Sequence, residues 1–344
     1  MPELNAKTAS VQPPGPERPK LLHTLGAAWP WLFLIGLLVF FEVWARISYQ
    51  TSFVLNLTNV QSVLLASVQP LLIALGLTLV IIAGGIDLSV GFTVGLAAVV
   101  SARMMQLLDP GLPAALSLLL AVVVALLASV VVGAVNGFLI ARLGVPPFIG
   151  TLGMYGVARG VGFLASGGST VATNNPLNSA LGNGKLLGVV PWPVVITVLV
   201  ALFMHYLLSR TRFGQYTYAI GGNRNAAVRA GIDVETHTIK LYMLTAVLAG
   251  VAGVIYTARF TAGAAQAGEP TLLDAIAAVV IGGASLFGGA GTVVGTLIGA
   301  LIIAVIQFGL VFIDVQPFWQ FIAVGAVIIL SVLVDQVRSG RGRT

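Results

Sequence analysis

LPAALSLLLAVVVALLASVVVGAVNGFLIA, residues 112–141, contains no charged side chain. A helix needs about 20 predominantly apolar residues to cross a hydrocarbon core of roughly 30 Å, so this stretch is long enough to span a membrane. A strand of a membrane barrel would instead alternate polar and apolar residues, because its lumen is wet, and no such alternation occurs here. The stretch therefore predicts a membrane-spanning helix.

The rest of the chain has the same character. Of its 344 residues, 58% are hydrophobic and 8% are charged, and the mean hydropathy is +1.01, which excludes a soluble globular protein. We expect an all-α polytopic membrane bundle of about ten transmembrane helices. The expected spans are 28–48, 61–83, 88–107, 112–141, 147–166, 189–209, 240–258, 271–287, 292–313 and 317–335.

The sequence carries no sign of catalysis or of a bound cofactor. There is no cysteine, and the three histidines, at 23, 205 and 237, stand apart from one another. No HExxH, GxSxG or phosphate-binding GxxxxGK[ST] motif occurs, and the nearest approach, GNGKLL at 182–187, lacks the hydroxyl after its lysine. We expect no catalytic residue and no metal, and any ATP must be bound by another chain.

Domain organisation follows from composition. Residues 1–25 are expected to form a disordered tail, because their first 20 residues are polar and proline-rich without periodicity. Residues 26–336 form the transmembrane domain, with a long polar loop at 210–239. Residues 337–344 form a short basic tail.

Basic residues indicate the orientation. If the N-terminus is cytoplasmic, the inside segments hold 12 of the 17 basic residues, and the segments on the other side hold Arg46, Arg103, Lys185 and Arg259. This bias predicts that both termini are cytoplasmic, and it explains the net charge of +6 without a nucleic-acid partner. The twelve are Lys7, Arg18, Lys20, Arg142, Arg210, Arg212, Arg224, Arg229, Lys240, Arg338, Arg341 and Arg343.

The polar loop has helix-capping signals of its own. Its sequence predicts a turn at Gly221–Gly222, an N-cap at Asn223 or Asn225, a short helix over 225–230 and a terminating glycine at Gly231. Isolated helices shorter than about 12 residues are marginal in water, so this one needs a partner or its own membrane helices to pack on. From these features alone, a solvated basic loop that only fixes orientation is equally acceptable.

Four motifs together resemble a known family. They are GGNRNAAVRAGI at 221–232, AGGIDLSVG at 83–91, PFIGTLGMYGVARGV at 147–161 and VIGGASLFGGAGTVVGTLIGALII at 280–303. In their order along the chain they resemble the permease subunits of bacterial ATP-binding-cassette importers of the ribose, xylose, arabinose and galactose type. The resemblance runs from about residue 60 to residue 335 and implies a monosaccharide permease of the bacterial inner membrane.

The resemblance also implies partners. These are a cytoplasmic ATPase that binds ATP and Mg²⁺, a periplasmic sugar-binding protein, and a second permease copy or a paralogue in the surrounding lipid. The sugar-binding protein would dock on outside loops that include 167–188 and 259–270. The implied ATPase-coupling residues are Gly222, Asn223, Arg224, Asn225, Ala226, Ala227, Arg229, Gly231 and Ile232. The resemblance assigns this role less directly to the two arginines, because acidic residues are common at these positions in relatives.

Asp87 is an acidic residue at the junction of two apolar spans. A charged residue deep in a membrane costs about 2.5–3.5 kcal/mol and is a functional candidate by default, yet Asp87 is also placed to cap the next helix. Several uncharged polar residues within spans are candidates to line a sugar path or to bond neighbouring helices. With Asp87, the candidates for path or cap are Ser89, Asn136, Thr151 and Tyr155.

An internal repeat and rival functions remain open. GGIDLSVG at 84–91 and GGASLFGG at 282–289 share a pattern at an offset of 198, which indicates two related halves unless the match is chance in a chain with 41 glycines.

Two alternatives to a monosaccharide permease are open. The same machinery carrying nucleosides, a furanone signal or branched-chain amino acids is one alternative. An ion-coupled secondary transporter is another, although it would keep ionisable residues deep in the bundle.

Overall fold

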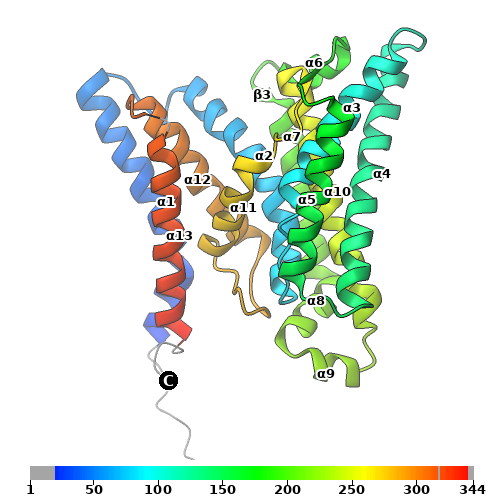
Figure 1. Cartoon of the computed structure of the whole chain (residues 1–344). Coiled ribbons are helices and arrows are strands. Elements are labelled where there is room, and N and C mark those ends of the chain that lie inside the picture. Colours follow the sequence, from blue (N-terminus) through cyan, green and yellow to red (C-terminus); the bar gives the residue numbers. More distant parts are fainter. Residues whose placement is uncertain (1–19, 317, 340–344) are drawn as a thin grey trace, which may run out of the picture.

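A computed structural model describes residues 20–316 and 318–339, and it confirms the all-α membrane bundle (Figure 1). The described helices are α1 Lys20–Tyr49, α2 Leu57–Ile82, α3 Val90–Leu108, α4 Ala114–Ala141, α5 Pro147–Ser166, α6 Pro176–Asn183, α7 Trp192–Arg210, α8 Arg212–Gly222, α9 Arg224–Arg229, α10 Val234–Phe260, α11 Glu269–Ile281, α12 Val293–Phe312 and α13 Phe318–Ser339.

The expected tails fall largely outside the described residues. Residues 1–19 and 340–344 lie beyond them, so the structure is silent on the disordered N-terminal tail and on most of the basic C-terminal one. Helix α1 already begins at Lys20, inside the segment expected to be a tail.

Eight of the described helices are long and apolar enough to cross a membrane: α1, α2, α3, α4, α5, α7, α10 and α12. The expected span 271–287 is wrong as a full crossing. Helix α11 has 13 residues, about 20 Å at 1.5 Å per residue, and the chain leaves the helix after Ile281. Helix α13 carries a shorter apolar segment, Phe318–Leu330, in the last expected span.

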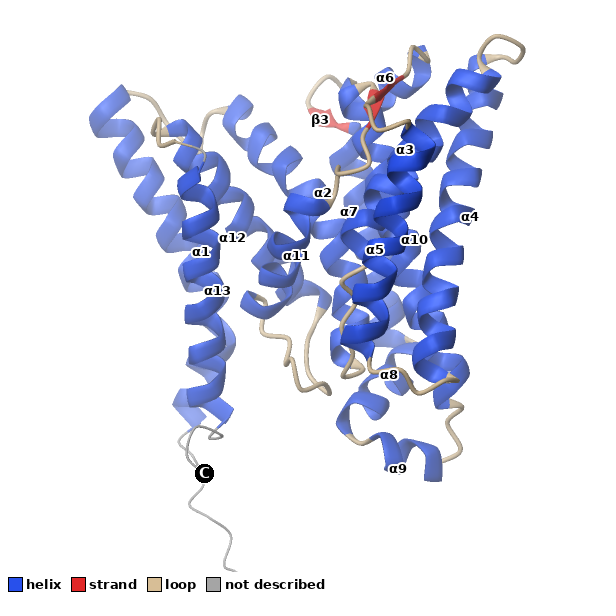
Figure 2. Ribbon diagram, viewed as in Figure 1, coloured by secondary structure: helices blue, strands red, loops and turns tan. Residues whose placement is uncertain are grey.

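Two-residue strands close one end of the bundle (Figure 2). They are β1 Val171–Ala172, β2 Lys185–Leu186, β3 Val190–Pro191 and β4 Ala262–Gly263. Strand β1 pairs antiparallel with β4, and β2 with β3. Figure 1 shows α6 and β3 at this end, and α8, α9 and the C-terminal end of α13 at the other.

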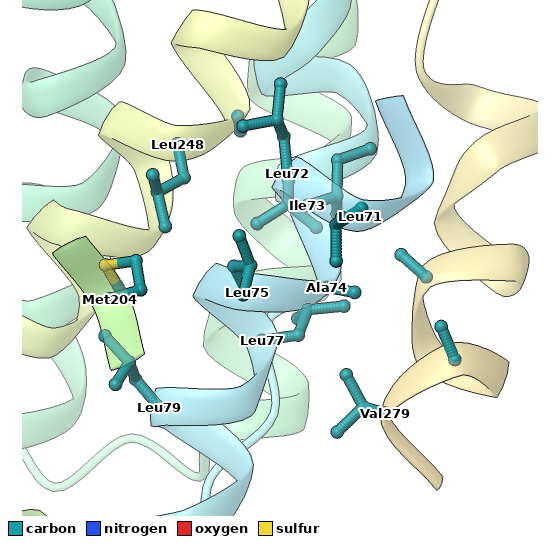
Figure 3. Packing of buried hydrophobic residues seen from close by; sticks show 14 of the residues in the cluster. Leu71, Leu72, Ile73, Ala74, Leu75, Leu77, Leu79, Met204, Leu248 and Val279 are labelled. Atoms are coloured by element: carbon teal, nitrogen blue, oxygen red, sulfur yellow. The ribbon is translucent and has the colours of Figure 1, made fainter. Parts of the chain in front are cut away.

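Helix α2 forms the centre of the bundle. It is apolar on all sides, which is typical of a helix buried in a core, and Leu72, Leu75 and Leu79 are fully buried. In Figure 3 these residues face Met204 of α7 and Leu248 of α10, with α11 on the opposite side.

The helix ends of α2 and α11 have the same geometry. After α2, Gly84 and Gly85 donate to the carbonyls of Ile81 and Val80, and after α11, Gly283 and Ala284 donate to the carbonyls of Val280 and Val279. Gly84 and Gly283 both have positive φ, at +81° and +87°. The structural offset is therefore 199 (283 minus 84), one more than the sequence match indicated. The sequence match therefore does not pair the residues that end the two helices, and a glycine cap of this kind ends many helices, so the two related halves stay a prediction.

Candidate functional site

The polar loop between α7 and α10 folds into two short helices. Helix α9 begins after Asn223, whose Oδ1 accepts a hydrogen bond from Ala226 N at 3.0 Å. It ends at Arg229, and Gly231, just after the C-cap Ala230, adopts a φ of +81° while its N–H donates to Val228 O at 3.0 Å. Both caps were predicted, and the helix begins one residue before the expected start. The turn expected at 221–222 is wrong, because these glycines are the last residues of α8.

Helix α9 is held to the bundle by one small face. Ala227 is buried at 3% exposure and packs with Ile220 of α8 and Val234 of α10, and Ile232 is partly buried against this cluster. The opposite face of α9 is open. Its exposed residues are Arg224, Asn225, Ala226, Val228 and Arg229. Of the predicted docking residues, Ala227 and Ile232 therefore anchor the helix, and an apolar exposed residue, Val228, was missed.

Helix α8 is fixed to α10 by a buried polar contact. His237 Nε2 lies 2.9 Å from Thr217 Oγ1, and the His237 ring packs on Phe213 at a centroid distance of 4.6 Å. Tyr218 also donates its hydroxyl hydrogen bond to the Gly291 carbonyl at 2.7 Å. Helix α8 is thus bonded both to α10 and to the loop that follows α11.

Four glycines from three segments meet at the C-terminal end of α2, in a group that we name the glycine junction: Gly84, Gly221, Gly288 and Gly289. Gly289 N donates to the Ile82 carbonyl at 2.8 Å. A Cβ on Gly221 would collide with that same carbonyl oxygen and lie 2.6 Å from Gly289 N. One on Gly288 would lie 2.9 Å from Gly221 O. Sequence alone could not find this junction, because its glycines come from three distant segments.

A pocket of about 510 Å³ opens beside the junction. Its lining combines the 83–85 turn, the start of α5, the end of α8 and one face of α10, including Gly85, Pro147, Asn223 and Tyr242. Helix α9 therefore lies at the mouth of a cavity that reaches the turn between α2 and α3.

Asp87, Ser89 and Asn136 form a buried cluster. Asp87 Oδ1 accepts from Ser89 N at 3.0 Å and from Ser89 Oγ at 2.6 Å, and Asn136 Nδ2 donates to Ser89 Oγ at 2.8 Å. Asp87 and Asn136 are fully buried. Ser89 is the N-cap of α3 and its side chain makes no capping bond; Asp87 bonds the Ser89 N–H at this turn instead. These three candidates lie together, and none of them lines an open surface.

Thr151 and Tyr155 lie elsewhere, on α5. Thr151 is buried and its hydroxyl bonds back to the Pro147 carbonyl at 2.8 Å. Tyr155 is partly exposed; its hydroxyl donates to Glu269 Oε1 at 3.4 Å and its ring meets the edge of Phe92. Glu269, at the start of α11, was not predicted as a candidate, although an acidic residue in the first helical turn is a recognisable signal.

The exposed face of α5 carries glycines. Cβ atoms built at Gly153, Gly156 and Gly160 meet nothing within 4 Å. On the same helix, the Arg159 guanidinium lies 5.2 Å from the centre of the Phe92 ring. Small residues on an exposed membrane helix let another helix approach closely.

Among the described residues, no group of three or more His, Asp or Glu side chains is placed to hold a metal ion.

Residues 59–332 match the family described as branched-chain amino acid transport system / permease component. The ribose import permease protein RbsC of Escherichia coli (strain K12) is 41% identical over 306 residues, covering 88% of this chain and 92% of that protein. The galactose/methyl galactoside import permease protein MglC of the same strain is 36% identical over 315 residues, covering 86% and 92%. Its D-allose transport system permease protein AlsC is 35% identical over 293 residues, covering 85% and 87%.

Proposed function

Because this chain belongs to the branched-chain amino acid transport system / permease component family, we propose that it is the permease subunit of an ATP-driven importer of a monosaccharide. The substrate class comes from the relatives, which are import permeases for ribose, galactose and allose. The observation that carries the proposal is α9, a capped helix whose open face projects from one end of the bundle.

We place this end in the cytoplasm. Among the residues that the structure describes, this end carries Arg210, Arg212, Arg224 and Arg229, as expected for inside segments of an inner-membrane protein. A separate ATPase, which supplies the ATP and Mg²⁺ site, docks on the open face of α9. Three of the predicted docking residues set the conformation of α9. Gly222 ends α8, Asn223 caps the start of α9, and Gly231 follows its C-terminal end with a positive φ.

The opposite end receives a periplasmic sugar-binding protein. It carries the β2–β3 hairpin, helix α6 and the β1–β4 pair, which fill the loops 167–188 and 259–270. Leu187 and Val189 of the hairpin are exposed, so they are available to such a partner.

A second copy of the chain completes the path. The open glycine face of α5 is suited to close helix packing, and Tyr155, Arg159 and Glu269 beside it offer aromatic and polar groups to a neutral sugar. Thr151 is less suited to contact sugar, because it is buried. The sugar then passes between two α5 helices.

The proposal predicts that the chain accumulates sugar only with its partners. The proteoliposomes contain the chain and its cognate ATPase, and ATP is supplied on the side of the membrane where the ATPase lies. Radiolabelled monosaccharide should then be concentrated when the binding protein delivers it. The chain alone should accumulate none under a proton or sodium gradient, because it has no nucleotide site and few buried ionisable groups. Concentrative uptake by the chain alone would establish a secondary transporter instead.

A further inference from the structure

The Asp87 cluster has two polar atoms without hydrogen-bond partners. They are Asp87 Oδ2 and Asn136 Oδ1, both buried and, with Asp87 ionised, both acceptors. Buried acceptors in proteins are nearly always satisfied, so a cluster that leaves two of them open lacks a donor.

The orientation of the Asn136 amide follows from the bonds around it. Ser89 Oγ gives its only hydrogen to Asp87 Oδ1, so it must accept from Asn136 and can only face the Nδ2 group. Turning the amide over would place two acceptors against each other. The Oδ1 of Asn136 is therefore left open by the geometry, and the missing donor cannot come from Ser89.

Asp87 also has no counter-charge. Among the described residues the ion pairs are Arg46–Glu42 and Arg142–Glu235, and neither includes it. The groups that face the turn are neutral: Asn136 from α4, Ser89 at the start of α3, and Tyr242 from α10, whose hydroxyl donates to Ile86 O at 3.2 Å. No charged side chain acts on Asp87. A fully buried and unpaired carboxylate is strongly disfavoured, and such a group neutralises instead.

We propose that Asp87 is a proton-binding site, and that the bound proton supplies the missing donor, as Oδ2–H, to Asn136 Oδ1. One proton then satisfies both open atoms and removes the buried charge. Through this hydrogen bond the proton links the 83–89 turn to α4. Gly84 of this turn also belongs to the glycine junction, so the proton site lies on the segment that meets α8.

The main test is infrared spectroscopy of the purified full chain. At about pH 5, below the pKa of about 6 to which burial raises Asp87, the wild-type spectrum should contain a carboxylic acid carbonyl stretch that is lost in Asp87→Asn. The exchange variant Asp87→Asn with Asn136→Asp should regain the band, because it carries the same set of groups in mirrored positions. Asp233→Asn, at an exposed residue, is the matched control and should leave the band unchanged.

Stability provides a second readout that transport activity does not enter. At a pH where the folded chain holds this proton and the unfolded chain does not, stability falls as pH rises. The wild-type unfolding midpoint should therefore decline with pH more steeply than that of Asp87→Asn, whose side-chain amide donates the same hydrogen bond at any pH.

Three results would overturn the proposal. One is a carboxylic acid band of equal intensity in the wild type and in Asp87→Asn, because an unchanged band must come from another acid such as Asp274. Another is a wild type and Asp87→Asn with identical pH profiles. The third is a sodium- or magnesium-dependent rise in the unfolding midpoint that Asp87→Asn abolishes, which would make the occupant a cation. The site is independent of the proposed function, so failure of ATP-driven uptake leaves these measurements valid.

Discussion

Replacing Gly221 with alanine should lower ATP-driven uptake by about tenfold or more, while replacing Gly36 with alanine should leave it close to normal. A methyl group at 221 would collide with the Ile82 carbonyl and crowd Gly289 N, and these are backbone atoms that cannot rotate away. Overpacking of this kind costs about 1–3 kcal/mol, and each 1.4 kcal/mol is about tenfold in an equilibrium. The strain falls between α8 and α2, where movement of the docked ATPase would be received.

Gly36 is the matched control because it also lies inside a helix, α1, has nothing within 4 Å of a Cβ, and belongs neither to the docking face nor to the glycine junction. Uptake should be measured in proteoliposomes at equal amounts of inserted protein, with the unfolding midpoint of each variant recorded. Equal uptake by the two variants would mean that the glycine junction does not connect α8 to α2.

Gly156→Trp should abolish most uptake without unfolding the chain. A Trp side chain at this position has open space within one copy, so folding is spared, but it occupies the surface that a second α5 must approach. Close helix contacts in lipid depend on small residues, and overpacking them by about 1–3 kcal/mol predicts a loss of about tenfold or more.

The control for this variant is Val131→Trp on α4, an exposed apolar position that the proposal assigns to lipid. Chemical cross-linking should show fewer permease dimers for Gly156→Trp and wild-type levels for Val131→Trp. If Gly156→Trp transports and dimerises like the wild type, the α5 face lies against lipid and the path runs elsewhere.

Hydropathy was sufficient to predict the class of fold and most of the spans, because long apolar runs have few alternatives in a membrane. It failed at α11 for a physical reason. The residues after Ile281 are apolar by composition, so they extend the hydropathy run, but Gly283 turns the chain out of the helix with a φ of +87°. Composition does not register a change of backbone direction.

The short helix α9 was predictable because its signals are local. An asparagine N-cap and a glycine with positive φ act over a few residues, and both appear as expected. Helix α8 was missed, since Gly221 and Gly222 favour a turn when read in isolation. Their helical conformation depends on contact with the end of α2 and the loop after α11, which no local pattern contains.

The polar candidates also show that local features could be predicted from the sequence and contacts between helices could not. Asp87 could be identified as a buried acid from its place between two spans, but its link through Ser89 to Asn136 on α4 could not, because that link depends on how α3 and α4 pack. The sequence grouped Thr151 and Tyr155 with them as polar residues in spans. In the structure these two lie apart on α5, and Tyr155 meets Glu269 of α11 instead.

Site-specific cross-linking gives the most direct test of α9 as the ATPase dock. The chain contains no cysteine, so Ala226→Cys places a single thiol on the open face of α9, and Val189→Cys places one at the opposite end. With a short thiol-directed cross-linker in the assembled importer, Ala226→Cys should join the ATPase and Val189→Cys should not. An ATPase that is captured from position 189, or that is never captured from position 226, would contradict the account.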